Sequence, residues 1–187
     1  GSGLAAIDAV LKLFKPGDEI ISTNDLYGGS YRLFTKIFED FGLKFHFVPM
    51  QDTSKIEAAI TEKTKLIWVE TPTNPMMNII DIEAVSKVAK AHNLLLAVDN
   101  TFATPYLQQP LDLGADIVMH SVTKYLGGHS DICAGAVAAS EEHITKIWNV
   151  AKNLGGSLSD YTVWLLERSM KTMKLRVKAQ NRNAKKL

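Results

Sequence analysis

The stretch LLLAVDNTFATP, residues 94–105, indicates the fold class of this chain. Its first five residues are apolar without interruption, as in a strand that is buried on both faces of a sheet. The segment DIEAVSKVAKAHN (81–93) precedes it and predicts an amphipathic helix that begins at the N-cap residue Asp81. Another apolar run, KLIWVE (65–70), lies before this helix. The three segments form a strand–helix–strand unit, which favours parallel pairing.

The same alternation extends along the chain. Further strands are expected at EIIS (19–22), KFHFVP (44–49), DIVMHS (116–121) and ICAGAVAA (132–139), and further helices at AAIDAVLKLF (5–14), YRLFTKIFEDFG (31–42) and SEEHITKIWNVAKNLGG (140–156). This order predicts an α/β fold with a mostly parallel sheet covered by helices. We expect residues 1–155 to form one α/β domain. Residues 156–187 are expected to be the end of that domain and the start of a helix that leads to a C-terminal domain outside this sequence.

The composition is that of a globular protein, because 187 residues of which 46% are hydrophobic can bury one sizeable core. No apolar run approaches the roughly 20 residues that cross a bilayer, and the opening GSGLAAIDAV has no secretory signal. We therefore expect no membrane partner. The single cysteine, Cys133, excludes an internal disulfide and favours a reducing cytoplasm. We expect Cys133 to be a small buried residue in a strand.

Basic residues gather at the C-terminal end of the sequence. Residues 168–187 hold eight lysines and arginines and no acidic residue, whereas the remainder of the chain is net acidic. A basic tail can indicate nucleic-acid binding. This tail lacks the interleaved aromatic residues on which bases stack, so we expect a helix with neighbours elsewhere in the fold and no nucleic-acid partner.

Polar, glycine-rich or aromatic segments follow four of the predicted strands. They are TNDLYGGSY (23–31), TPTNP (71–75), DNTFATP (99–105) and HSVTKYLGGHSD (120–131). Ligands bind beyond the carboxyl ends of the strands in open α/β sheets, so we expect these segments on one rim. The segment GSGLAAI (1–7) places small residues at a helix N-terminus, where free N–H groups form an anion site. It is neither a Walker A loop nor a dinucleotide fingerprint, because the required spacings are missing.

Each candidate residue on this rim has two interpretations. Asp99 either caps a turn or pairs with a cation in a partly dry site. Lys124 is either an exposed charge or an amine that desolvation makes nucleophilic. Tyr27 is either a core aromatic or a flat ring, beside two glycines, against which a planar ligand packs. Ser121 and Thr123 either donate to a phosphate or make local turn hydrogen bonds.

An anion site, a lysine amine, an aspartate and a stacking aromatic together suit pyridoxal phosphate. The lysine forms an imine with the aldehyde, and the aspartate keeps the pyridine nitrogen protonated. A non-catalytic nucleotide- or anion-binding module and a structural domain with a basic tail are the alternatives, but both leave the joint placement of Tyr27, Asp99 and Lys124 unexplained. His129 and Asp131 have no further ligands at suitable spacing, so we expect them to shape the loop after Lys124 and expect no metal.

Five motifs spread over nearly the whole chain closely resemble the Cys/Met-metabolism family of pyridoxal-phosphate enzymes. They are SGLAA, YGGSYRLF, ETPTNP, VDNTFATPYLQQPLDLGADIV and HSVTKYLGGHSDICAG. The resemblance implies the large cofactor-binding domain of a fold-type I, aspartate-aminotransferase-like enzyme. It also implies a homotetramer built from dimers that share active sites. In the family, a neighbouring subunit and a C-terminal domain complete the phosphate and substrate-carboxylate sites, so this chain resembles a piece of a longer enzyme.

The resemblance also implies a role for each matched position. Lys124 would be the Schiff-base lysine that shuttles protons, Asp99 would pair with the pyridine nitrogen, and Tyr27 would stack on the ring and help to deprotonate the incoming amine or the leaving group. The other cofactor-binding positions would be Gly3 and Leu4 (phosphate, through backbone amides), Ser121 and Thr123 (phosphate, through hydroxyls), Asn74 (near the phenolic oxygen) and Thr101 (ring region). Arg32 could face the substrate, although a solvated helix arginine is favoured.

The implied reaction is a pyridoxal-phosphate-dependent γ-elimination on a sulfur amino acid, as in cystathionine γ-lyases. Gly29 stands where methionine γ-lyases typically carry a cysteine, which weighs against that activity. The alternatives are γ-replacement on an activated homoserine, as in cystathionine γ-synthases, and methionine γ-lyase or β-lyase activity.

Overall fold

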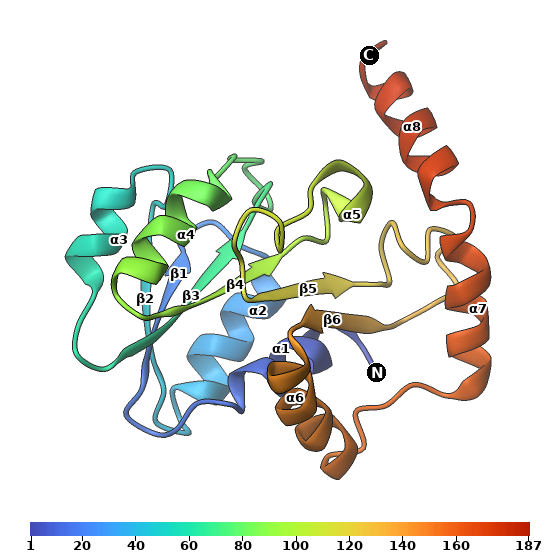
Figure 1. Cartoon of the computed structure of the whole chain (residues 1–187). Helices are drawn as coiled ribbons and strands as arrows, with labels where there is room; N and C mark the ends of the chain where they lie inside the picture. Colours follow the sequence, from blue (N-terminus) through green and yellow to red (C-terminus); the bar gives the residue numbers. More distant parts are fainter.

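The computed structural model describes residues 1–187 and contains one six-stranded sheet with helices on both faces (Figure 1). The strands are β1 (Glu19–Thr23), β2 (Lys44–Val48), β3 (Thr64–Glu70), β4 (Leu95–Asp99), β5 (Ile117–Ser121) and β6 (Gly135–Ala139). Their order is β2-β1-β3-β4-β5-β6. The first five strands are parallel, and only β6 pairs antiparallel, with β5. The predicted α/β fold with a mostly parallel sheet is therefore confirmed.

The helices match the predicted alternation, with two additions in the first two-thirds of the chain. They are α1 (Gly3–Leu11), α2 (Gly28–Leu33), the π-helix η1 (Phe34–Phe38) that continues α2, α3 (Thr53–Ala59), α4 (Ile82–Ala91), α5 (Thr104–Leu107), α6 (Glu141–Asn153), α7 (Asp160–Met170) and α8 (Met173–Ala184). Helices α3 and α5 were not predicted. Asp52 caps α3, but this helix buries only Ile56, so its sequence carries little amphipathic pattern.

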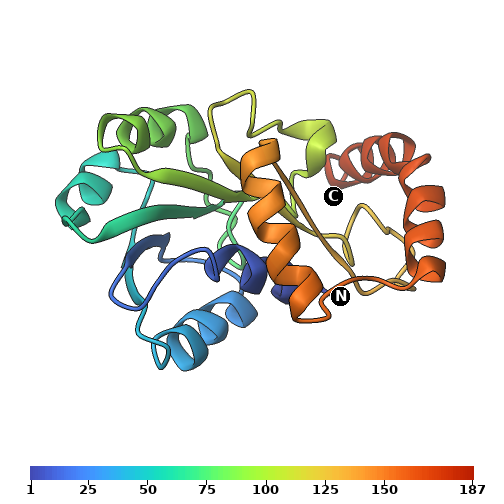
Figure 2. The same cartoon turned by 60° about the horizontal axis from the view of Figure 1, so that its bottom comes forward.

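Helices lie on both faces of the sheet (Figures 1 and 2), and the sheet separates two apolar layers. Helix α1, η1 and α6 pack on one face, and α3 and α4 pack on the other. Successive residues of β3 illustrate this division, because Leu66 and Trp68 join the first layer whereas Ile67 and Val69 join the second. All four are fully buried, and each contributes about 1.5–3 kcal/mol of transfer free energy. Burial on both faces therefore explains the continuous apolar runs of β1, β3, β4 and β5, whereas β2 and β6 at the two edges of the sheet are less buried.

The strand order creates a crevice at one end of the sheet. The chain leaves β1 to enter β2 on one side, whereas it leaves β3 to enter β4 on the other. Such a reversal opens a space beyond the carboxyl ends of the two adjacent strands. The segments that follow β1 and β3, with Tyr27 and Asn74, lie at this reversal.

Helices α7 and α8 extend beyond the β6 edge of the sheet (Figure 1). Leu165 and Leu166 of α7 and Met173 of α8 pack against a small cluster that includes Val122 and Leu126, next to Lys124. The assignment of residues 156–187 as the end of one domain and the approach to another stays a prediction. None of the helices has the length and apolar character needed to span a bilayer.

Candidate active site

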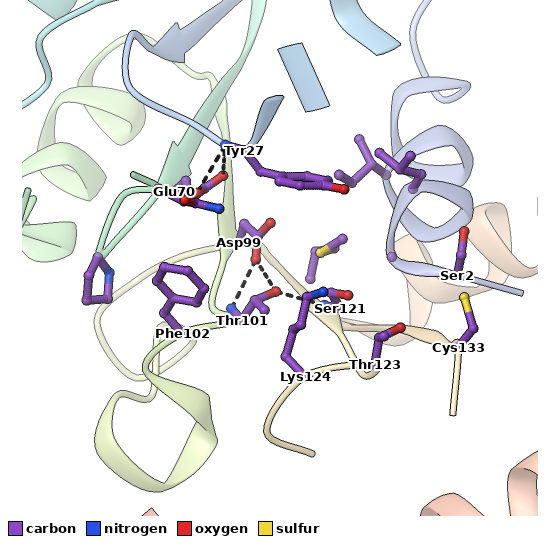
Figure 3. A pocket seen from close by; sticks show the side chains of 16 residues that line it. Ser2, Tyr27, Glu70, Asp99, Thr101, Phe102, Ser121, Thr123, Lys124 and Cys133 are labelled. Carbon is purple, nitrogen blue, oxygen red and sulfur yellow. Dashed lines mark hydrogen bonds between the residues drawn. The ribbon is translucent and has the colours of Figure 1, made fainter. Parts of the chain in front are cut away.

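A cavity of about 420 Å³ lies at the carboxyl ends of β1, β3, β4 and β5, beside the N-terminus of α1 (Figure 3). Its volume is in the range of small-molecule sites. Sixteen residues line it, including all nine that the sequence predicted: Gly3, Leu4, Tyr27, Asn74, Asp99, Thr101, Ser121, Thr123 and Lys124. The structure thus brings together residues from five segments of the chain.

Asp99, Thr101 and Ser121 form a chain of hydrogen bonds across two strand ends (Figure 3). The Ser121 amide donates to the Thr101 hydroxyl at 2.8 Å, and that hydroxyl donates to Asp99 Oδ1 at 2.5 Å. The Thr101 amide also donates to Asp99 Oδ1, at 3.0 Å. The second carboxylate oxygen, Oδ2, accepts no hydrogen bond within the chain. This leaves one oxygen of a buried, oriented carboxylate available to a ligand.

Tyr27 is held by a residue that the sequence did not single out, Glu70. The backbone N–H of Tyr27 donates to Glu70 Oε2 and Oε1, at 3.0 and 3.2 Å. The residue is 44% exposed, and its ring lies across the cavity from Lys124 (Figure 3). Its core-aromatic interpretation is therefore wrong, since the ring faces the cavity. Gly29 allows this placement, because a Cβ at that position would lie 2.3 Å from a Tyr27 ring carbon.

The segment that carries Asn74 is fixed by Asp25, which the sequence reasoning also missed. The Thr73 hydroxyl and the Met76 amide donate to Asp25 Oδ2, the latter at 3.1 Å. The Asn78 side-chain amide donates to the same oxygen at 3.4 Å. Asp25 thus ties the loop after β3 to the loop after β1. The motif TNDLYGG carried a signal for this role, since an aspartate between strand and helix commonly accepts loop hydrogen bonds.

The start of α1 forms the opposite wall of the cavity. Ser2 caps the helix by accepting from the Ala5 amide at 3.0 Å, which leaves the amides of Gly3 and Leu4 at the first two helical positions. Amides at these positions have no partner within a helix. A Cβ on Gly3 would lie 2.8 Å from Ser121 Cβ and 2.9 Å from Ser121 Oγ, so the absent side chain keeps the wall close to Ser121.

Lys124 lies in the turn after β5 with its side chain exposed at the cavity. Its ammonium makes no ion pair or hydrogen bond within the chain. In this chain alone the side chain is open to water. The hydroxyl of the neighbouring Thr123 pairs with the backbone of Ala134, accepting its amide at 3.1 Å and donating to its carbonyl at 3.3 Å. Ser121 Oγ makes no such bond.

Two buried carboxyl groups dominate the electrostatics of the cavity. Burial, reinforced by the neighbouring Asp99, raises the pKa of Glu70 to about 8, and the backbone hydrogen bonds of Tyr27 and Asn74 only partly oppose this. Burial likewise raises the pKa of Asp99, against the opposing hydrogen bonds from Thr101. A cationic group placed between these carboxyls would relieve both effects. The cavity is therefore suited to a ligand with a positive charge near β3 and β4.

Cys133 corrects one prediction. It is exposed and lines the cavity near Ser2 instead of being buried in a strand (Figure 3). Strand β6 begins only at Gly135, where a Cβ would lie 2.1 Å from the Ser2 carbonyl oxygen. Arg32 is exposed and does not line the cavity, as the favoured interpretation predicted. His129 shapes the loop after Lys124, because its Nδ1 lies 2.7 Å from the Gly127 carbonyl oxygen.

Glu70 carried only a weak signal in the sequence. In the sequence it is the last residue of the apolar run KLIWVE. Only the register of β3 against β4 shows that it lies opposite Asp99. Phe102, Pro72 and Met119 also line the cavity and supply apolar surface. These residues follow or belong to the same strand ends as the predicted ones, so they were predictable from the sequence on the same grounds.

Curated proteins similar to this chain are enzymes of sulfur amino-acid metabolism. The chain is 49% identical over 187 residues to the cystathionine gamma-synthase/O-acetylhomoserine (thiol)-lyase of Bacillus subtilis, of which it covers 50%. It is also 49% identical to the cystathionine beta-lyase of Lactococcus lactis subsp. cremoris, of which it covers 49%. The chain thus spans about half the length of the relatives it matches.

A solved structure has the same architecture. The crystal structure of cystathionine gamma-lyase from Lactobacillus plantarum, complexed with L-serine, superposes with a TM-score of 0.91 at 50% identity. The match covers 93% of this chain and 46% of the other. The family model for Cys/Met metabolism PLP-dependent enzymes matches residues 1–187, the whole of this sequence. The chain therefore belongs to the Cys/Met metabolism family of pyridoxal-phosphate-dependent enzymes.

Proposed function

We propose that this chain is the cofactor-binding part of an enzyme that carries out γ-elimination on a sulfur amino acid, in the manner of a cystathionine γ-lyase. One observation carries the proposal. Tyr27, Asp99 and Lys124, which are far apart in the sequence, line one cavity of about 420 Å³ together with an exposed helix N-terminus. No simple anion-binding module requires an amine, a buried carboxyl and an aromatic ring in the same cavity.

The phosphate end of the cofactor fits the wall between α1 and β5. The amides of Gly3 and Leu4 are free of helical partners, and Ser121 Oγ has no partner within the chain. Backbone N–H groups at a helix N-terminus favour an anion. The close approach of Gly3 to Ser121 forms a cradle that a side chain at position 3 would fill. Thr123 would join this site only by exchanging its bonds to Ala134.

The pyridine ring of the cofactor fits beside the carboxyl groups of Glu70 and Asp99. Asp99 Oδ2 is unpartnered, and burial raises the pKa of Asp99 in the absence of a cation. A protonated pyridine nitrogen beside it would restore the carboxylate, since an opposite charge a few ångströms away favours the ionised form. Tyr27 supplies the flat ring on the other side, and Asn74 lies where it could reach the phenolic oxygen.

Bound pyridoxal phosphate supplies an aldehyde that reacts with amines and a ring that accepts electron density from the substrate. The residues of this chain bind, orient and move protons. Lys124 Nζ would be the amine that holds the cofactor and that takes up the proton of the substrate α-carbon. Tyr27 Oη would take a proton from the incoming amine or give one to the leaving sulfur. Asp99 holds the positive charge in place.

The three other reactions named for this family remain alternatives. The relatives include proteins named gamma-synthase, beta-lyase and gamma-lyase at nearly equal identity. Gly29 stands where methionine γ-lyases typically carry a cysteine, which weighs against that activity. A side chain at Gly29 would meet the Tyr27 ring at 2.3 Å, so a cysteine there would need a different ring position. We propose γ-elimination, with γ-replacement as the alternative that product analysis distinguishes.

The proposal extends to the assembly and its location. A small sulfur amino acid would be the substrate, and a homotetramer of dimers with shared active sites would supply the groups that this chain lacks. We further propose a cytoplasmic enzyme, which the single cysteine of this chain supports. Residues 1–155 would form the cofactor-binding domain, and residues 156–187 would connect it to the substrate-binding part.

The test is a titration of the full-length protein with pyridoxal phosphate. We expect a visible absorption band that is lost in Lys124→Ala and retained in Lys36→Ala, an exposed lysine away from the cavity that makes no ion pair. With cystathionine and water, a γ-lyase releases cysteine, 2-oxobutanoate and ammonia, whereas a β-lyase releases homocysteine, pyruvate and ammonia. Cystathionine formation from an activated homoserine, without release of 2-oxobutanoate, would favour the γ-synthase alternative. Absence of the band in the unmodified protein would contradict the proposal and favour a non-catalytic anion-binding module or a structural domain.

A further inference from the structure

The loop that carries Lys124 is a tight succession of turns. The Lys124 amide donates to Ser121 O at 3.1 Å, the Gly127 amide to Val122 O at 2.8 Å, and the Gly128 amide to Lys124 O at 2.7 Å. These bonds use the carbonyls of residues 121, 122 and 124. The carbonyls of Tyr125 and Leu126, directly after the lysine, receive no backbone amide. Leu126 is buried, so its carbonyl requires a partner from elsewhere in the chain.

Arg176 of α8 supplies that partner from 50 residues further along the chain. Its Nη1 donates to Tyr125 O at 2.7 Å, and its Nη2 donates to Leu126 O at 3.2 Å. The same guanidinium reaches Ser169 O of α7 at 2.8 Å through Nη2 and Thr172 Oγ1 at 3.0 Å through Nε. One planar group therefore joins the lysine loop, the end of α7 and the start of α8.

All four acceptors of Arg176 are uncharged, and no carboxylate forms an ion pair with it. The guanidinium therefore acts through the fixed directions of its N–H groups and not through charge pairing. A lysine at this position would keep the positive charge but could not donate N–H groups in the same fixed directions to all four acceptors. The basic tail was expected to be a helix with neighbours elsewhere in the fold, and Arg176 is a base of this tail that is used inside the fold.

Two further features fit the guanidinium into the loop. A Cβ at Gly128 would lie 1.8 Å from Arg176 Nη1, and Gly128 has a φ of +73°, so the space for the guanidinium depends on a glycine there. Val122 and Leu126 pack in one apolar cluster with Leu166 of α7 and Met173 of α8. The loop is thus held by apolar contacts on one side and by the guanidinium at its carbonyls.

We propose that Arg176 is a positioning residue for Lys124: by holding the carbonyls of Tyr125 and Leu126, it fixes the loop and thereby the place of Lys124 Nζ relative to Asp99 and Tyr27. The inference rests on the proposed function, in which Lys124 is the reacting amine. Arg176 touches neither the cavity nor a ligand, so its effect is transmitted through the backbone. Any movement of α7 and α8 against the sheet would also act on Lys124 through this contact.

The experiment compares Arg176→Lys and Arg176→Ala with Arg182→Lys in the full-length enzyme. Arg182 is an exposed base on the same helix that makes no hydrogen bond or ion pair. Two quantities are measured: the pH midpoint of the visible band of the pyridoxal-phosphate-loaded enzyme, and the hydrogen–deuterium exchange of residues 121–128 in the cofactor-free enzyme. We expect both Arg176 variants to shift the midpoint and to speed the exchange at Gly127 and Gly128 about tenfold, and Arg182→Lys to change neither.

The band midpoint and the exchange rate together distinguish a failure of this inference from a failure of the proposed function. A lower melting temperature in the Arg176 variants with an unchanged midpoint and unchanged exchange would overturn the inference, because the residue would then be merely structural. If the unmodified enzyme shows no visible band, the proposed function fails, but the exchange measurement still decides whether Arg176 holds the loop. If Arg176→Ala does not fold, Arg176→Lys carries the comparison alone, since it conserves the charge and most of the side-chain volume.

Discussion

Glu70 and Asp99 are direct register partners at the carboxyl ends of two neighbouring parallel strands, and both carboxyl groups line the same cavity. Strand neighbours are only about 5 Å apart, so the ionised forms of the two groups repel each other at short range. Ionisation of the pair therefore lowers the free energy of unfolding, unless a cation lies between the two groups.

The first prediction concerns this cost in the cofactor-free protein. The pKa of Glu70 is raised to about 8 from an ordinary 4.5, so its contribution to stability is full below about pH 4.5 and is lost as the pH rises through 8. The free energy of unfolding should fall by up to about 1.4 kcal/mol per pH unit within this window. Glu70→Gln should flatten the fall, as urea unfolding at several pH values would show.

The control for this prediction is Glu57→Gln, an exposed carboxyl on α3 that makes no ion pair. It should keep the slope of the unmodified protein. Equal slopes for the unmodified protein and Glu70→Gln would show that the Glu70 carboxyl is not the group that titrates. Saturation with pyridoxal phosphate should reduce the slope, because a bound pyridinium favours the ionised pair.

The second prediction concerns the cradle between α1 and β5. Gly3→Ala places a methyl group 2.8 Å from Ser121 Cβ, so one wall must move. Overpacking of this kind costs about 1–3 kcal/mol, which corresponds to roughly 5- to 150-fold weaker binding of pyridoxal phosphate. Gly156→Ala is the matched control, since its nearest neighbours lie at 3.6–3.9 Å. Fluorescence titration measures both, and unchanged affinity in Gly3→Ala would contradict the assigned phosphate site.

The third prediction concerns the hydroxyl of Thr101, which links the Ser121 amide to Asp99. Thr101→Val keeps the shape but removes the link and leaves the Ser121 N–H without an acceptor, at a cost of about 1–3 kcal/mol in stability. We expect a lower melting temperature and weaker cofactor binding. Thr101→Ser retains the hydroxyl and should behave like the unmodified protein. If Thr101→Val binds the cofactor normally, the orientation of Asp99 does not depend on this bond.

The fourth prediction uses Cys133, which is exposed on the wall of the cavity. An alkylating reagent should modify it readily in the cofactor-free protein, and saturating pyridoxal phosphate should slow the reaction at least several-fold by closing access. Mass spectrometry of the peptide that contains Cys133 measures the rate. Protection should disappear in Lys124→Ala at cofactor concentrations that protect the unmodified protein. Equal rates with and without cofactor would place the ligand away from this wall.

Much of the fold was predictable because parallel strands buried on both faces leave continuous apolar runs, and all six runs contain a strand. The errors have local causes. The run ICAGAVAA predicts a strand throughout, whereas β6 begins at Gly135 and Cys133 lies outside it, because the backbone of the intervening Ala134 is bonded to the Thr123 hydroxyl. Helix α3 was missed because a short helix that buries one side chain carries almost no periodic signal.

The strand ends that form the candidate site were predictable from the sequence, but the contacts that join their residues were not. Glu70 acquires its place from the register of β3 against β4, and Arg176 from contacts made across 50 residues of chain. Neither relationship is encoded in local spacing. In the sequence, Arg176 is one of eight bases in the tail, and nothing distinguishes it from Arg182.

The walls of the cavity have a consequence for how the protein folds. They come from six segments, which range from Ser2 to Cys133, and each is placed only when its strand or helix has joined the sheet. Such non-local contacts form late and slowly in folding. Cofactor binding should therefore appear only after the sheet is complete and then pull the folding equilibrium forward by mass action. The recovery of binding is accordingly a stricter measure of refolding than the recovery of helical content.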